Sequence, residues 1–287
     1  MEHTRRAVYA QPEWLARVPR DRRLPHEPTV YTGCGTSFHA AQTGGQAVQA
    51  LDAVVRQPEA DVMVAVSHEG TTALTLQALQ EFDGQRWVVT AKEDSPIAHA
   101  CDEVVVATPE VEESWCHTVS YTCAVAALAA LRGDDIGRLP DAVQDVLDGD
   151  HLPVSGHERW LVAGAGRDWP TAQEAALKLR EGCFVACEAH QTEQLLHGHL
   201  AAVDESVRCL VFEGVGRAAE RARDAVSALE ELGCEVALIP TRHPVVDIVH
   251  VHLLVLDLAA ARGVNPDRIR RDDPRWARAA ERHGGAA

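Results

Sequence analysis

The stretch Thr29-Val-Tyr-Thr-Gly-Cys-Gly-Thr-Ser37 decides the fold, because a short β-rich run ends in a glycine turn and a helical stretch follows it. The same unit returns as Trp160-Leu-Val-Ala-Gly-Ala-Gly166, with Gly33 and Gly164 lying 131 residues apart. One G-x-G turn is weak evidence of any fold. Its repetition after the first strand of each half predicts an α/β protein with two doubly wound parallel-sheet domains in tandem, of the flavodoxin-like type.

Apolar runs and helical stretches alternate through both halves of the chain. In the first half we expect strands at 29–32, 62–66, 87–90 and 104–107, with helices at 37–51 and 71–82. In the second half we expect strands at 160–163, 207–212 and 236–239, with a helix from about 170 to 188. Continuous apolar strands separated by helices predict a parallel sheet covered on both faces.

A segment rich in Gly, Asp and Pro, residues 134–156, separates the two repeats. Such punctuation is typical of a domain boundary. We therefore predict a first domain with an N-terminal helix at 1–145 and a second domain with a C-terminal tail at 146–287.

The charge and the apolar content limit the partners. A formal net charge of −16 disfavours nucleic acid as a partner. The apolar run Val249–Ala261 is interrupted by two histidines and an aspartate, and is too short to span a membrane, so no membrane partner is expected. The eight cysteines lack paired CxxC spacing and read as reduced residues of a cytoplasmic protein.

The basic residues are almost all arginines. Of the 27 basic residues only Lys92 and Lys178 are lysines. Only an amine can lose its proton at accessible cost, so a retained lysine can serve a purpose that arginine cannot. Chance survival explains the two equally well on composition alone.

Neither glycine turn completes the dinucleotide fingerprint G-x-G-x-x-G, because Phe38 and Trp169 occupy its last position. The turns offer hydroxyl groups instead. The candidate ligand loops are Cys34-Gly35-Thr36-Ser37 and Ser67-His68-Glu69-Gly70-Thr71-Thr72. Ordinary helix capping would explain one such loop, but two at adjacent strand ends favour a site for an anion or a polar sugar.

The second-half helix carries three charged residues on one face. Glu174, Lys178 and Glu181 are spaced i, i+4, i+7, nearly opposite the apolar stripe. This face meets either bulk water or a cleft. Past the helix, a loop contains His197, which with Glu181 has the residue types that carbon and oxygen proton transfer need. His197-x-His199 lacks a third ligand, so neither a metal nor a cofactor is expected.

These motifs resemble the sugar isomerase (SIS) family, and within it the isomerase half of glucosamine-6-phosphate synthases. The resemblance covers roughly residues 7–270, and the specific part lies between Glu174 and His197. It rests on Gly33-Cys-Gly-Thr-Ser37, Ser67-His-Glu-Gly-Thr-Thr72, Glu174-Ala-Ala-Leu-Lys-Leu-Arg-Glu181 and Gln194-Leu-Leu-His-Gly198.

The resemblance implies roles for these residues. The two hydroxyl-rich loops would hold a sugar and its phosphate. Glu181 would shuttle a proton between C1 and C2 beside Lys178, with Glu174 in the same catalytic group. His197 would open the sugar ring, in this family often from a neighbouring subunit, which implies a homodimer.

The sequence also departs from the family pattern. The resemblance does not extend to a glutaminase domain, so we expect none, and the stretch 264–273 lacks the essential C-terminal lysine of the synthases. Glu69 replaces the second serine of the usual phosphate loop, and Glu193-Gln194 replaces the Gly-Glu that precedes the last motif. A carboxylate at 69 should repel a phosphate dianion unless a cation intervenes, Glu69 points away, or it pairs with a substrate amine.

Three functions therefore compete. The first is an isomerase or deaminase of a phosphorylated amino sugar or ketose. The second is a deglycase of amino-acid–sugar-phosphate adducts, to which Glu69 would be suited. The third is a non-catalytic sugar-phosphate sensor, against which the retained Glu181 and His197 argue.

Overall fold

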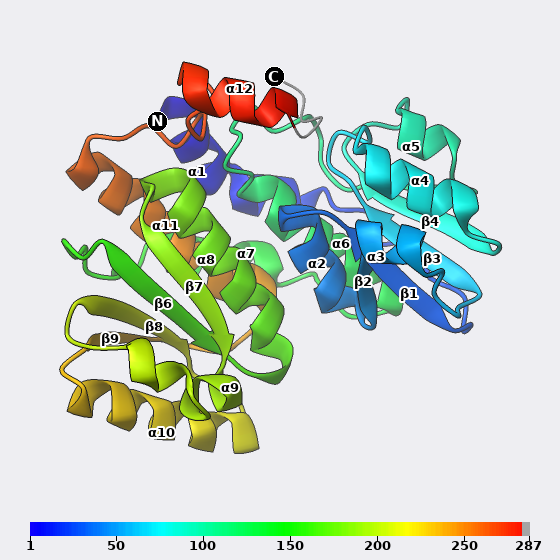
Figure 1. Cartoon of the computed structure of the whole chain (residues 1–287). Helices are drawn as coiled ribbons and strands as arrows, with labels where there is room; N and C mark the ends of the chain where they lie inside the picture. The colour runs from blue at the N-terminus through cyan, green and yellow to red at the C-terminus, as the bar shows by residue number, and fades with distance from the viewer. Residues whose placement is uncertain (283–287) are drawn as a thin grey trace.

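The computed structural model describes residues 1–282 and contains two wholly parallel sheets (Figure 1). The first sheet has the order β2 (Ala47–Gln49), β1 (Thr29–Gly33), β3 (Val62–Val66), β4 (Gln85–Thr90), β5 (Glu103–Val106). The second has the order β7 (Ala186–Gln191), β6 (Arg159–Gly164), β8 (Val207–Phe212), β9 (Glu235–Ile239). The α/β architecture predicted from the sequence is confirmed.

Each sheet is covered on both faces because its strands alternate apolar side chains between two cores. On β3, Val62, Val64 and Val66 join the large central core, whereas Met63 and Ala65 join an outer one. The outer face of the first sheet is covered by α3 (Ala50–Val55), α4 (Ala73–Glu81) and α5 (Pro96–His99). The outer face of the second is covered by α9 (Thr192–Leu196) and α10 (Arg217–Glu231).

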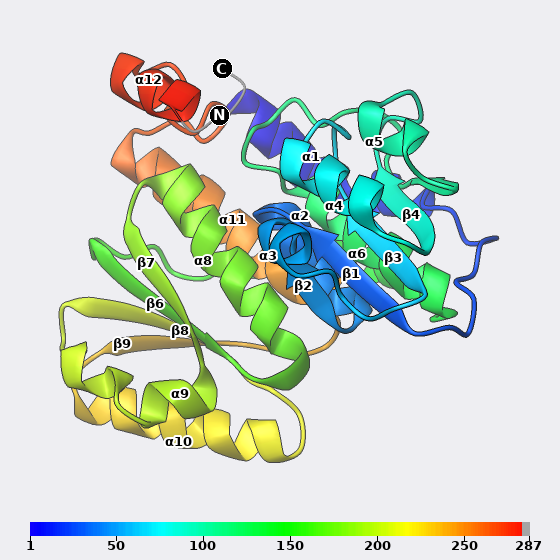
Figure 2. The same cartoon turned by 45° about the vertical axis from the view of Figure 1, so that its right-hand side comes forward.

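A layer of helices lies between the two sheets (Figure 2). The side chains of these helices belong to one continuous core. The layer consists of α1 (Glu2–Ala16), α2 (Thr36–Gly44), α6 (Val119–Arg132), α7 (Leu139–Leu147), α8 (Trp169–Cys183) and α11 (Pro244–Arg262). A last helix, α12 (Pro274–Arg282), lies at the surface near the N-terminus. The first-half helix α2 therefore packs directly against the second-half helix α8.

Helix α11 is longer than the apolar run seen in the sequence. Its 19 residues have a mean hydropathy of 1.7, enough by length and composition to cross a membrane. However, 72% of that stretch is buried inside the protein, where it packs on α8, α7 and α6. An apolar helix buried on all sides is typical of the core helix of a large α/β protein.

The predicted helix 37–51 is wrong. Helix α2 ends at Gly44, the edge strand β2 follows, and α3 begins at Ala50. Gly44 lies against the ring of Tyr31, where an added Cβ would come within 2.5 Å of Cε1. Gly45 has φ +150°, which a helix cannot contain. The glycine pair therefore ends the helix and turns the chain beside β1.

The predicted helix 170–188 also ends early, at Cys183, because Phe184 adopts the left-handed conformation with φ +59°. Residues 186–191 then form the edge strand β7, and α9 follows at once. The stretch expected to be a loop is therefore mostly regular structure. The predicted boundary segment 134–156 likewise contains α7, which packs on α1 and α11; the domain limits themselves stay a prediction.

Candidate active site

The strand order of the first sheet creates a crevice where β1 and β3 lie side by side and their connections leave in opposite directions. Ligands of doubly wound sheets bind at this kind of switch point, outside the carboxyl ends of the strands. A cavity of about 270 Å³ lies there. Its walls include Cys34, Thr36, Ser37, Ser67, His68, Glu69, Thr71, Thr72, Thr90, Thr108, Trp115, His117, Ser120, Tyr121 and Glu181.

Glu181 is the contribution of the second half to this cavity. It lies near the C-terminal end of α8, and its side chain is 23% exposed. Its Oε2 accepts a hydrogen bond from Lys178 Nζ over 2.6 Å. Burial raises the pKa of Glu181, although the Lys178 ammonium opposes this shift. A carboxyl group that is both accessible from the cavity and readily protonated suits general acid–base chemistry.

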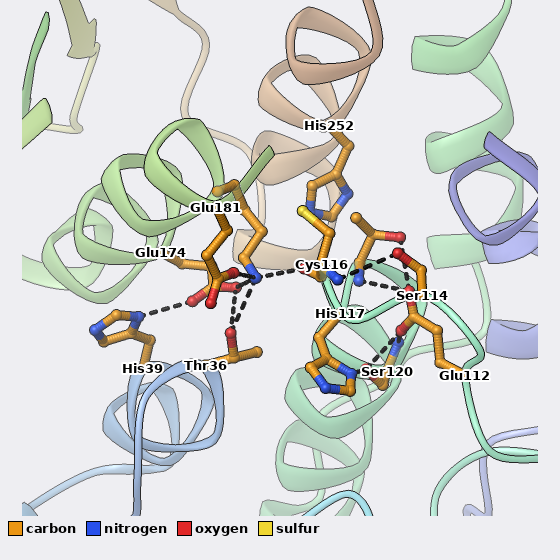
Figure 3. Close-up of polar contacts among 12 residues, drawn as sticks. Thr36, His39, Glu112, Ser114, Cys116, His117, Ser120, Glu174, Glu181 and His252 are labelled. Atoms are coloured by element: carbon orange, nitrogen blue, oxygen red, sulfur yellow. Dashed lines mark hydrogen bonds and ion pairs between the residues drawn. The ribbon is translucent and has the colours of Figure 1, made fainter. Parts of the chain in front are cut away.

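Lys178 lies behind the cavity wall and is fully buried. Its ammonium donates to Thr36 Oγ1 over 3.1 Å, to the backbone carbonyl of Cys116 and to Glu181, and lies 3.3 Å from Glu174 Oε1 (Figure 3). Burial disfavours the charge, but the two carboxylates outweigh it and raise the pKa of Lys178. The lysine therefore stays charged and fixes Glu181 in place.

Glu174 is also fully buried and does not reach the cavity. His39 Nδ1 lies 2.7 Å from its Oε2, and Thr36 Oγ1 donates to Oε1 over 3.1 Å. Burial opposes its ionisation, but Lys178 and His39 overcome this and lower its pKa. The face of α8 that carries Glu174, Lys178 and Glu181 was predicted to meet either bulk water or a cleft. The prediction of bulk water is wrong, because this face packs against α2.

The predicted ligand loops meet at the cavity. Of their residues, Cys34, Thr36, Ser37, Ser67, His68, Glu69, Thr71 and Thr72 line it, whereas Gly35 does not. Gly70 shapes the second loop, because its φ of +68° is in the left-handed region and a Cβ there would collide with the Ser95 side chain. Thr90, on the next strand, donates its hydroxyl to the His68 carbonyl over 3.1 Å.

The charge of Glu69 is partly offset. Lys92 Nζ lies 3.6 Å from its Oε2, and both side chains are about 40% exposed. Lys92 therefore places a cation beside this carboxylate; the role of Glu69 toward a ligand stays a prediction. Both lysines of the chain lie next to carboxylates that line the cavity.

Sequence reasoning missed one wall entirely, the segment 112–121, which comprises the end of the loop after β5 and the first turn of α6. The buried carboxylate of Glu112 accepts hydrogen bonds from the backbone N–H and hydroxyl groups of both Thr118 and Ser120. These four bonds hold the segment so that Trp115, His117 and Ser120 face the cavity. The available signal was a run of polar and aromatic residues in the loop between a strand and the next helix.

The C-terminal stretch reaches this wall. The guanidinium carbon of Arg271 lies 3.6 Å from the ring centroid of Trp115. Arg271 also interacts electrostatically with Glu69 and Glu181. The segment in which the resemblance leads one to look for a lysine therefore brings an arginine close to the cavity, and a guanidinium does not form an imine.

His197 does not line the cavity of its own chain. It ends α9, on the outer face of the second sheet, and its side chain is 70% exposed. Its Nε2 lies 2.7 Å from Glu193 Oε1, and Arg221 binds the same carboxylate. Its expected action in a neighbouring subunit stays a prediction.

Comparison with known proteins agrees with this geometry. The SIS domain family matches residues 155–262, the region that contains α8 and Glu181. The match places the similarity to a SIS domain in the second half of the chain. The SIS domain thus supplies the carboxylate, and the first-half sheet supplies most of the cavity that it faces.

Two relatives that match most of the chain carry the same protein name. A glutamine–fructose-6-phosphate aminotransferase (isomerizing) of Symbiobacterium thermophilum is 28% identical over 83% of this chain and 49% of its own length. Its counterpart from Pyrococcus horikoshii is 26% identical over 86% of this chain and 51% of its own length. The chain therefore spans about half the length of these relatives.

Solved structures share the fold. The C-terminal domain of glucosamine-fructose-6-phosphate aminotransferase from Francisella tularensis has a TM-score of 0.80 at 19% identity, covering 92% of this chain and 97% of that one. Tagatose-6-phosphate ketose/aldose isomerase from Escherichia coli has a TM-score of 0.77 at 16% identity, covering 93% and 95%. The two halves of the chain together thus share the fold of these two solved structures.

Proposed function

We propose that this protein interconverts the aldose and ketose forms of a phosphorylated sugar or amino sugar. Glu181 removes the proton from C2 or C1, an enediol or enolamine forms, and the same carboxyl group returns the proton to the other carbon. With an amino sugar, hydrolysis of the resulting imine by water would release ammonia, which makes deamination an extension of the same step.

The observation that carries the proposal is the position of Glu181 in the cavity wall, 2.6 Å from a buried ammonium. A carbon acid needs a base that is accessible but partly withdrawn from water, so that its pKa lies closer to neutrality. Burial supplies this shift. The fixed charge of Lys178 behind the wall keeps the carboxyl group in one orientation.

The first-half loops support a phosphate or polyhydroxyl ligand. Thr36 and Thr72 lie at the N-terminal ends of α2 and α4, where free backbone N–H groups and the helix dipole favour an anion. The buried hydroxyl of Thr108 lines the cavity and has no hydrogen-bond partner among residues 1–282. A sugar hydroxyl would satisfy it.

Glu69 favours a second candidate within the same chemistry, a deglycase that cleaves amino-acid–sugar-phosphate adducts. Its carboxylate lines the cavity and is about 40% exposed, so a substrate ammonium could bind between it and the ligand loops. Glu181 would then carry the same proton transfer. The two candidates differ in whether the substrate bears an amino-acid nitrogen.

A homodimer in which His197 reaches the cavity of the partner also belongs to this proposal. The exposed side chain of His197 at the end of α9 is compatible with such a contact. A sugar-phosphate sensor is the alternative from a different class. It has no use for a titratable carboxyl group in the binding wall.

The deciding experiment is solvent exchange. The protein is incubated in D2O with fructose 6-phosphate, glucosamine 6-phosphate or a fructosyl-amino-acid 6-phosphate, and deuterium at C1 and C2 is followed by NMR. We expect deuterium incorporation with at least one substrate. Binding of these ligands without any incorporation would contradict the proposal and favour the sensor.

A further inference from the structure

His117 supplies an imidazole to the cavity from within the same chain. It lines the cavity together with Glu181 and lies on the opposite wall from α8 (Figure 3). Its backbone has φ +45°, an uncommon conformation for a residue other than glycine. Strained residues of this kind persist where the surrounding structure holds them, and they cluster at functional sites.

The hydrogen bonds around His117 fix its tautomer. Ser120 Oγ has one proton and donates it to Glu112 Oε2 over 2.6 Å, because the carboxylate can only accept. His117 Nδ1 lies 3.4 Å from the same Oγ and must therefore be the donor to it. This assignment places the proton on Nδ1 and leaves the lone pair on Nε2. Within residues 1–282, Nε2 has no hydrogen-bond partner.

The neighbouring groups keep this imidazole neutral until a ligand arrives. Burial, and then the charge of Lys178, lower the pKa of His117 to about 4. The ring of His68 lies edge-on at 5.4 Å and is held by the Glu112 backbone N–H, which donates to its Nε2 over 2.9 Å. A phosphate dianion bound in the cavity would favour the protonated imidazole and so make Nε2 more basic.

We propose that His117 is the catalytic residue that opens the sugar ring, and that Ser120 and Glu112 are positioning residues that hold its tautomer. This role rests on the proposed isomerase function. In the step, Nε2 takes the proton of the anomeric hydroxyl and a carbonyl group forms at that carbon. The bond from the anomeric carbon to the ring oxygen breaks, and the proton passes from Nε2 to that oxygen. The proton is conserved, and no co-reactant is needed.

This proposal differs from the expectation for His197, which lies outside the cavity of its own chain. It also explains why a lysine is not required in the C-terminal stretch. Ring opening would proceed by proton transfer alone, without an imine.

The test compares a substrate that cyclises with one that cannot. Fructose 6-phosphate closes through its 5-hydroxyl, whereas 5-deoxyfructose 6-phosphate lacks that hydroxyl and stays open. Deuterium exchange in D2O is measured with both for the full chain, for His117→Asn and for Ser120→Ala. Asparagine is chosen because it tolerates positive φ better than most residues. His99→Asn, an exposed histidine on α5, is the matched control.

We expect His117→Asn to slow exchange of fructose 6-phosphate by roughly 100-fold or more, while exchange of the open analogue stays within about threefold. Ser120→Ala should show the same selectivity with a smaller loss of about tenfold. Equal losses on both substrates, no loss on either, or a ring-selective loss in His197→Asn with none in His117→Asn would overturn the proposal. Failure of the unmodified protein to exchange either substrate would instead refute the isomerase function on which the proposal rests.

Discussion

The ammonium of Lys178 lies 2.6 Å from Glu181 Oε2 and 3.3 Å from Glu174 Oε1, so one buried cation serves two carboxylates with different tasks. Glu174 is sealed behind it, whereas Glu181 opens onto the cavity. The ionisation of the two carboxylates is pushed in opposite directions, with the pKa of Glu174 lowered and that of Glu181 raised. Such a divergence is typical of a site that needs one fixed charge and one mobile proton.

Glu181→Gln should abolish proton transfer and leave ligand binding largely intact. The amide retains the shape and a hydrogen bond to Lys178 but cannot accept the carbon-bound proton, so exchange in D2O should fall by about 10³-fold or more. Calorimetric affinity for the same sugar phosphate should change by less than about fivefold. Glu220→Gln, an exposed carboxyl on α10, is the control. Parallel loss of affinity and exchange would make Glu181 a structural residue.

The pH dependence of kcat/KM should also reveal the role of Glu181 as a base. Because the pKa of Glu181 is raised, its base form is lost as pH falls through a value above that of an ordinary glutamate. We therefore expect kcat/KM to decrease on the acid side at a pH above 4.5, and the residual activity of Glu181→Gln to lack this limb. An acid limb that is unchanged in the variant would assign the titration to another group.

Lys178→Met should destabilise the protein by about 3–5 kcal/mol, because it leaves the buried carboxylate of Glu174 and the partly buried carboxyl group of Glu181 without their cation. Glu174→Gln combined with Lys178→Met should recover part of this loss, since one of the two uncompensated charges is then removed. Urea denaturation of the single and double variants gives the coupling energy. Additive effects would show that the pair is not coupled in the folded protein.

The Glu69–Lys92 pair should govern affinity for phosphorylated ligands. Glu69→Ser removes a negative charge from the cavity wall and should tighten binding of fructose 6-phosphate by roughly 3- to 10-fold. Lys92→Ala should weaken it, because the charge of Glu69 is then no longer offset. Binding of unphosphorylated fructose should change little in either variant. Thermal shifts at matched ligand concentrations compare each of the two variants with each of the two ligands.

A different site should dominate the pH dependence of stability. Asp247 is buried, and burial raises its pKa to about 7, although the backbone N–H groups of Arg242 and His243 oppose this. The folded state therefore binds this proton more tightly than the unfolded state does. The free energy of unfolding should fall as pH rises from about 4 to 7, on the order of a few kcal/mol. Asp247→Asn should flatten this slope; an equally steep slope in the variant would point to Asp168 instead.

The parts of the fold that the sequence predicted depend on local pattern. Apolar strands such as β3 and β8, and the loops that end them, follow from residue type alone. Two edge strands escaped for different reasons: β2 is only three residues long, and the six residues of β7 are mostly polar or small rather than a continuous apolar run. What makes them strands is the neighbour that they pair with, and no local pattern carries that information.

The candidate site divides in the same way. The spacing of Glu174, Lys178 and Glu181 placed them on one face, but which of them reaches the cavity depends on how closely α2 approaches α8. His117 was missed because its position depends on the hydrogen bonds of Thr118 and Ser120 to Glu112 and on a positive φ. No spacing rule describes these contacts within the loop.

The bond from Lys178 to the Cys116 carbonyl joins a helix of one half to a loop of the other, and the shared central core joins the halves again. During synthesis the first half leaves the ribosome before α8 exists. Until the second half arrives, it has a ligand crevice but no base. The apolar faces of α1, α2 and α6 are buried only in the core that both halves share. Because the crevice and Glu181 come from different halves, the proposed activity would report that both halves have folded together.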